Sequence, residues 1–188
     1  INIPTLNESL YQEGITVLDF ESRDFSGGID RNGNPIWFVD KNQFNTRFTL
    51  THFLDNGNVI GFEPDKGYEI DLNGNRFFET PDGYSVHHDF IKTSRNTYFI
   101  ISAIIEEHYC PDECNTSLGE TILWQGDNFR EFDQSGHEIW NWSTFEYIDS
   151  TEYNPYYVEI YNGWGEMDWT HSNSVFFDQY TESVFVSI

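Results

Sequence analysis

Two short histidine-containing strings hold the residues of this sequence best suited to chemistry. VHHDF contains His87 and His88, and DWTHSNS contains His171. Each string opens an expected β-hairpin, which places His87 and His171 at comparable registers, with Asp89 and Asn173 two residues further on. Imidazoles at matched registers, each near a carboxylate or amide able to fix its tautomer, are typical of an anion or metal site. A single histidine at such a position is ordinarily a hydrogen-bonded structural residue.

The other three histidines carry weaker signals. His52 lies within an expected strand, His108 in an insertion, and His137 in a hairpin turn. We expect each of them to be structural or exposed.

The elements that must position the histidines repeat along the chain. Hairpins with an Asn-Gly or Ser-Gly turn, followed by an aromatic residue, occur at 29–38, 70–79 and 132–141. A second class of hairpin alternates with the first, at 48–60, 87–100 and 171–186. Two alternating hairpins make a four-stranded antiparallel unit, which is one blade of a β-propeller.

The spacing of the repeats reveals two insertions. Asp30 and Asp71 are 41 residues apart (71 − 30), close to a usual blade period, whereas Asp71 and Asp133 are 62 apart (133 − 71). We therefore place insertions near 104–126 and 144–166, the second rich in Tyr and Trp. Long loops of that composition are more often functional than disordered.

The predicted fold class is all-β, with residues 1–188 as one partial β-propeller domain. The repeats supply three to four blades, and a ring of three does not close. We expect the chain to be the N-terminal half of a larger, six-bladed propeller. Missing C-terminal blades, or another chain, would then complete the ring.

The Asp-x-Asn-Gly-Asn strings also invite a calcium interpretation, which their spacing disfavours. An EF-hand loop needs Gly at its sixth position and Glu at its twelfth, but Gly33 and Gly74 occupy the fourth. Both strings lie between expected strands. We interpret them as hairpin turns.

Charge and hydropathy exclude several partners. Nine Lys and Arg face 32 Asp and Glu, for a formal charge of −23. This surface repels the phosphates of nucleic acid and anionic membranes. We interpret the charge as a solvated acidic surface that keeps the protein soluble, and the alternative interpretation is specific binding of Ca²⁺. No run of about 18 apolar residues predicts a membrane insertion. The first ten residues show no signal-peptide pattern, as expected of a mature N-terminus.

Two cysteines, Cys110 and Cys114, are separated by three residues in CPDEC. The pair lacks the two further ligands of a structural zinc site. We prefer a small disulfide loop formed in an oxidising compartment, extracellular or periplasmic, and the alternative is two free thiols.

The histidine strings and the blade repeats together resemble the arylsulfotransferase family of secreted β-propellers. The resemblance covers nearly the whole chain, in the family's order, and includes 13–18 and 28–37 at the entry to the first blade. It implies transfer of a sulfuryl group from a phenolic sulfate ester to a phenol, through a histidine intermediate and without a nucleotide donor. The expected partners are therefore aryl sulfates and phenols, with no cofactor and no metal.

By motif, His171 and one or both of His87 and His88 match the family's sulfate-binding histidines, and Asn173 lies beside them. The family's nucleophilic histidine follows these motifs, and its arginine would follow Ile188, so no catalytic residue is assigned within the chain. A different class of function remains open, because propellers host many unrelated activities. That alternative is a non-catalytic extracellular β-propeller that serves as a binding or assembly module.

Overall fold

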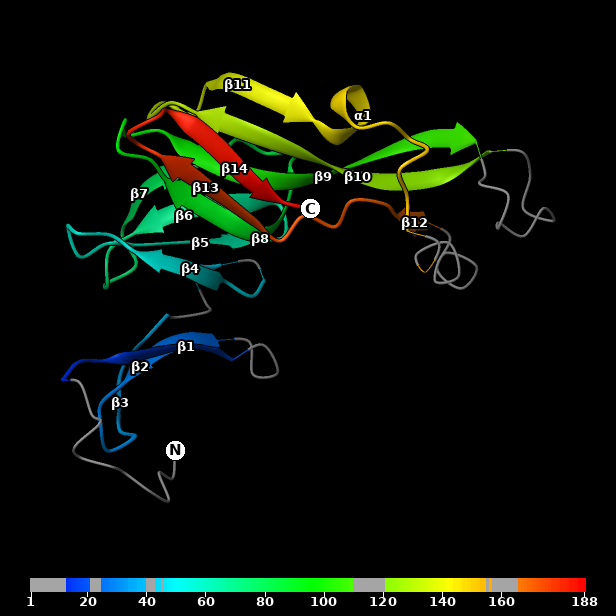
Figure 1. The fold of residues 1–188 in the computed structure, drawn as a ribbon. Coiled ribbons are helices and arrows are strands. Elements are labelled where there is room, and N and C mark those ends of the chain that lie inside the picture. The colour runs from blue at the N-terminus through cyan, green and yellow to red at the C-terminus, as the bar shows by residue number, and fades with distance from the viewer. Residues whose placement is uncertain are drawn as a thin grey trace.

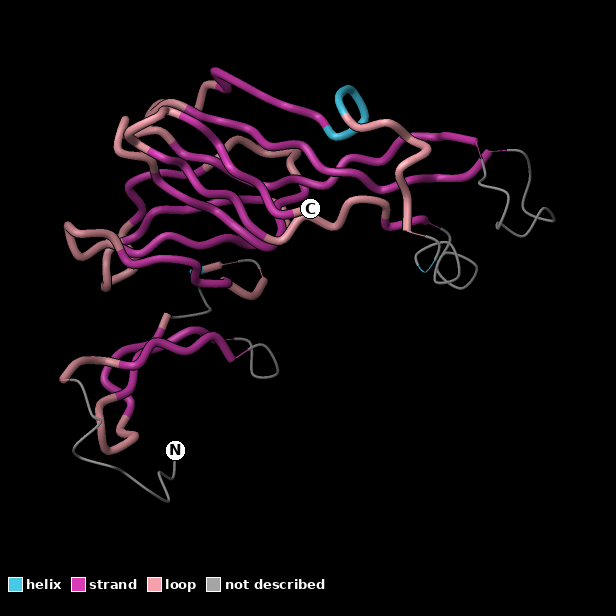
Figure 2. The backbone as a smooth tube through the Cα atoms, in the orientation of Figure 1, coloured by secondary structure: helices cyan, strands magenta, loops and turns pink. Residues whose placement is uncertain are grey.

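The computed structural model describes residues 13–20, 25–39, 43–44, 46–109, 121–154, 156 and 166–188. Figure 1 shows these residues arranged as β-sheets with one short helix, and Figure 2 shows how strand dominates the backbone. The prediction of an all-β chain built from antiparallel propeller blades is confirmed. No helix in the described ranges is long and apolar enough to span a membrane.

The first two sheets follow the repeat pattern. The first has the order β1-β2-β3, with β1 Thr16–Phe20, β2 Phe25–Ile29 and β3 Pro35–Phe38. The second is a complete blade of order β4-β5-β6-β7, with β4 Thr49–Phe53, β5 Val59–Glu63, β6 Lys66–Ile70 and β7 Arg76–Glu79. Each strand pairs antiparallel with its neighbour in the chain, as in a propeller blade.

The third and fourth sheets carry the histidine strings. The third has the order β8-β9-β10-β11, with β8 Ser85–Lys92, β9 Tyr98–Tyr109, β10 Thr121–Phe132 and β11 Glu138–Ser143. The short helix α1, Thr144–Tyr147, follows β11, and β12, Glu166–Asp168, pairs parallel with β10. The fourth sheet is a hairpin of β13, Ser174–Asp178, and β14, Ser183–Ser187.

The turns between β-strands form as their residue types predict. Asp71 Oδ1 accepts hydrogen bonds from the backbone N–H groups of Asn73 at 2.8 Å and Asn75 at 2.9 Å. Gly74 adopts a φ of 84°, a left-handed conformation that glycine reaches without steric cost. The Asn75 side chain and these N–H groups hold the pKa of Asp71 below its ordinary value. The carboxylate of Asp71 is therefore bonded within the turn, in agreement with the interpretation of this string as a hairpin turn.

Aromatic side chains fill the space between consecutive blades. Phe78 of β7 stacks on Tyr98 of β9 with ring centroids 3.7 Å apart, and both join a buried cluster with Phe90 and Ile60. A second buried cluster, which includes Phe99, Phe129, Val175 and Phe177, joins the third sheet to the fourth. Packing of sheet on sheet accounts for the order of the blades in Figure 1.

The described parts of the insertion predicted near 104–126 are strand. β9 and β10 remain paired out to Tyr109 and Thr121, so the two strands project as a ribbon beyond the rest of the blade (Figure 1). A small core of Ile122, Trp124, Met167 and Trp169 packs on one face of this ribbon. Cys110 and Cys114 lie outside the described residues, and their disulfide stays a prediction.

Candidate functional site

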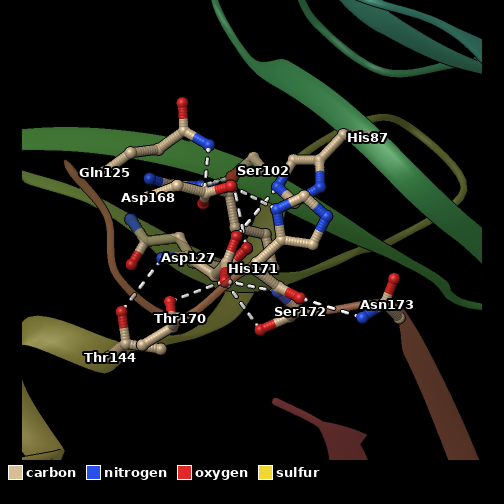
Figure 3. Close-up of polar contacts among 12 residues, drawn as sticks. His87, Ser102, Gln125, Asp127, Thr144, Asp168, Thr170, His171, Ser172 and Asn173 are labelled. Atoms are coloured by element: carbon tan, nitrogen blue, oxygen red, sulfur yellow. Dashed lines mark hydrogen bonds and ion pairs between the residues drawn. The ribbon is translucent and has the colours of Figure 1, made fainter. Parts of the chain in front are cut away.

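The two histidine strings meet where neighbouring sheets begin. His87 and His88 lie in β8 at an irregularity of its pairing with β9, between Val86 and Phe90. His171 lies in the segment that connects β12 to β13. Figure 3 shows His87 and His171 side by side, with the carboxylates of Asp127 and Asp168 next to them.

The three imidazoles form one cluster. The ring centroid of His88 lies 5.1 Å from that of His87 and 4.9 Å from that of His171. His88 and His171 both have left-handed backbone, with φ of 56° and 37°. A residue other than glycine rarely adopts such values, and those that do gather at functional sites.

Asp127 of β10 is the carboxylate beside His87. Its Oδ1 lies 2.8 Å from His87 Nε2. The ring N–H is not directed at this oxygen, and both buried atoms lack a formed hydrogen bond.

The second oxygen of Asp127 binds the segment that carries His171. Oδ2 accepts hydrogen bonds from Thr170 Oγ1 at 2.7 Å, Ser172 Oγ at 2.7 Å and Ser172 N–H at 2.8 Å. Burial raises the pKa of Asp127, but His87, Ser172 and Thr170 together lower it by more. The net pKa lies below the ordinary value of 3.8, so the carboxylate is ionised at neutral pH.

His171 has its own carboxylate. Asp168 Oδ2 is hydrogen-bonded to His171 Nδ1, and Asp168 Oδ1 accepts a bond of 3.4 Å from Gln125 Nε2. With Nδ1 engaged, Nε2 is the ring nitrogen left for a ligand. The side chain of His171 is 39% exposed, so solvent reaches it.

His88 has no carboxylate within ion-pair distance among the pairs found in the described residues. Partial removal from water lowers the pKa of His88 below its ordinary value of 6.5, and His87 and His171 lower it further. Asp127 and Asp168 raise it by a smaller amount. His88 is therefore neutral at pH 7, with one ring N–H and one lone pair.

The partners expected two residues after each histidine are wrong. Asp89 accepts hydrogen bonds from the N–H groups of Phe90 and Val175, and its Oδ1 lies 3.3 Å from His52 Nε2. In a regular strand His87 and Asp89 would share a face, but the irregularity between Val86 and Phe90, with His88 at a φ of 56°, breaks this alternation and directs Asp89 away from the cluster. Asn173 Nδ2 donates to the backbone carbonyl of His171 at 3.0 Å, not to its ring.

The remaining histidines lie away from the cluster. His52 is in β4 beside Asp89, and His108 at the end of β9 stacks on Phe145 with centroids 4.7 Å apart. The side chain of His137 is 82% exposed in the β10–β11 turn. Their surroundings match the structural or exposed positions expected of them.

Three residues of the site were missed by sequence reasoning, namely Asp127, Asp168 and Gln125. Asp168 stands three residues before His171 in DWTHSNS, so its proximity was readable locally. Asp127 is 40 residues from His87 (127 − 87) and carries no motif.

In the described residues, no group of three or more His, Cys, Asp or Glu is arranged to hold a metal ion. The arrangement is suited instead to an anion, which imidazole N–H groups can bind.

The fold and the site define a class: a protein built of β-propeller blades, with a histidine cluster where β8 begins and in the segment before β13. The family model described as "Arylsulfotransferase (ASST)" matches residues 4–188. The chain belongs to the arylsulfotransferase family. Among curated proteins, no significant match was found.

Proposed function

We propose that the protein transfers a sulfuryl group from a phenolic sulfate ester to a phenol, and that the histidine cluster binds the sulfate. One observation carries this proposal: three imidazoles from two separate segments converge, and two of them are on left-handed backbone. Membership of the arylsulfotransferase family supports the class of reaction and its aryl sulfate and phenol substrates.

His87, His88 and His171 are proposed to bind the sulfate oxygens. Asp127 faces one nitrogen of His87 at 2.8 Å, and Asp168 is hydrogen-bonded to one nitrogen of His171, so in each ring the other nitrogen is left for the ligand. When protonated, that nitrogen donates to a sulfate oxygen. Neutral His88 contributes one further N–H.

Asn173 is proposed as a weaker contributor to the same site. One hydrogen of its amide is engaged with the His171 carbonyl, and the second remains for an anion. The residue is exposed at the entrance to β13, where its side chain can meet a ligand that approaches from solvent.

In the proposed reaction, a histidine nitrogen attacks sulfur as the S–O bond to the donor phenol breaks. The donor leaves as phenolate and takes a proton. The acceptor phenol then attacks sulfur, loses its proton to a base, and the N–S bond breaks to restore imidazole. Fixed N–H donors stabilise charge that develops on the sulfuryl oxygens in both steps. The histidine that carries the intermediate is not assigned to a residue described here.

The acidic surface of the protein is compatible with binding of a negatively charged aryl sulfate. Charges separated by more than about 8 Å are largely screened at physiological salt. The distant carboxylates that give the formal charge of −23 thus slow association more than they weaken binding. An acidic, solvated surface also fits the secreted, extracellular or periplasmic location that we propose from the composition. Further blades, or another chain, are proposed to complete the ring.

Replacement of His171 by Ala tests the proposal. In the intact protein, we expect the barrier to transfer to rise by about 2.7–4 kcal/mol, the effect of one lost oxyanion donor. The assay follows transfer from a chromogenic aryl sulfate to a phenol, with a thermal melt of the same sample. His137→Ala is the matched control, because the exposed His137 side chain lies in a distant turn.

Unchanged turnover with a lowered melting temperature would make His171 a structural histidine. The non-catalytic binding or assembly module would then be the better interpretation. Loss of turnover in His137→Ala as well would show that the assay reports general damage.

A further inference from the structure

Asp127 stands between the two histidine-bearing segments. It lies in β10, it is 1% exposed, and its backbone N–H donates to Thr144 Oγ1 at 2.9 Å. This bond fixes the position of the residue from the side of α1. The carboxylate thus projects from a rigid strand toward β8 and toward the β12–β13 connection (Figure 3).

The two oxygens of Asp127 have different partners. Oδ2 holds Thr170 and Ser172, the residues on either side of His171, through three hydrogen bonds. Oδ1 faces His87 Nε2 at 2.8 Å. One buried carboxylate therefore sets the position of both histidines, although they are 84 residues apart (171 − 87).

We propose that Asp127 is a positioning residue that fixes His87 as its Nε2–H tautomer and sets the spacing of His87 and His171. This proposal rests on the proposed function of the histidine cluster. An ionised carboxylate accepts hydrogen bonds and donates none, so the facing nitrogen must carry the proton. Nδ1 of His87 is then the nitrogen presented to a ligand, and it donates to an anion when the ring takes up a second proton.

The present orientation of His87 leaves its hydrogen bond to Asp127 incomplete. Its Nε2–H is within reach of Asp127 Oδ1 but is not aligned with it. Catalytic hydrogen bonds are often poorly aligned before the ligand binds and tighten in the complex. A small rotation of the imidazole completes the bond.

Asp127→Asn in the full chain tests the tautomer directly. The variant keeps an oxygen for Thr170 and Ser172 but turns an N–H₂ donor toward His87, so Nε2 must become the acceptor. Long-range ¹H–¹⁵N spectra of the imidazoles, recorded at a pH where His87 is neutral and assigned with His87→Gln, report which nitrogen is protonated. We expect Nε2–H in the natural protein and Nδ1–H in the variant. Transfer activity should fall by about 10-fold to 100-fold, the range for carboxylates that orient functional histidines.

Ser172→Ala is the matched control, because it removes one bond to Oδ2 and leaves His87 untouched. The proposal is overturned if Ser172→Ala switches the tautomer too, or if Asp127→Asn does not. Should Asp127→Asn fail to fold, the spectrum of the natural protein decides, and an Nδ1–H tautomer of His87 refutes the proposal. The tautomer is measured without substrate. If the natural protein showed no transfer activity, the proposed function would be refuted, but the tautomer of His87 could still be tested.

Discussion

The buried carboxylate of Glu69 provides the most demanding test of how the blades hold together. Glu69 lies in β6 of the second sheet and is 2% exposed. Its Oε2 accepts hydrogen bonds from Lys92 Nζ at 2.7 Å and Tyr98 Oη at 2.6 Å, both from the third sheet. Oε1 accepts a bond of 2.7 Å from Asn58 of its own sheet. One side chain thus ties two blades together.

Replacement of Glu69 by Ala leaves the Lys92 ammonium and the Tyr98 hydroxyl without their acceptor in a buried place. Removal of one member of a buried pair costs about 3–5 kcal/mol, because the remaining charge stays desolvated. We expect the free energy of unfolding to fall by about this amount at pH 7, measured by chemical denaturation of the intact protein. Glu79→Gln is the control, since Glu79 is 43% exposed, and an exposed ion pair contributes about 0–1 kcal/mol.

The effect should depend on pH in a defined direction. Burial raises the pKa of Glu69, but Lys92, Tyr98 and Asn58 lower it by more, so the folded pKa lies below the ordinary 4.5. The stability that Glu69 contributes is therefore present above pH 4.5 and is lost as pH falls through the folded pKa. A Glu69→Gln variant should differ most from the natural protein above pH 4.5. A loss below 1 kcal/mol at pH 7 for Glu69→Ala, or a difference that grows in acid, would refute this account.

Two further predictions concern packing and covalent structure. Gly61→Ala would place a Cβ 2.2 Å from the backbone oxygen of Thr49 and 2.5 Å from Phe48 Cζ; it should destabilise the fold by about 1–3 kcal/mol or more, seen as a lower melting temperature. A thiol count on unreduced, denatured protein should find no free thiol at Cys110 and Cys114, and two titratable thiols would contradict the disulfide.

The turns and hairpins were predictable because their causes are local. Asp71 and Gly74 define their turn within five residues, and the repeat of that pattern located the blades. The cluster of His87 with His171 followed from register, since equivalent strands of neighbouring blades begin at the same end of the propeller. The extension of β9 and β10 was predicted only as an insertion near 104–126, although the alternation of Ile122 and Trp124 with exposed residues has the period of a strand.

The carboxylate partners of the histidines were less accessible. Spacing in sequence pointed to Asp89 for His87, because residues two apart share a face of a regular strand, but the irregularity in β8 between Val86 and Phe90 breaks that alternation. The actual partner, Asp127, comes from β10, two strands away in the same sheet. Its position depends on the bulge in β8 and on the path of the β12–β13 connection, and both arise from packing between sheets. Such contacts leave no local pattern to read.

The left-handed backbone at His88 and His171 has a consequence for how the site can change. A residue with a Cβ loses about 1–2 kcal/mol in this conformation, whereas glycine does not. Glycine at either position would relax that strain while it removes an imidazole. Stability of the local backbone alone would therefore favour glycine at both positions. The proposed binding of an anion requires histidine there, so stability and activity favour different residues at these two positions.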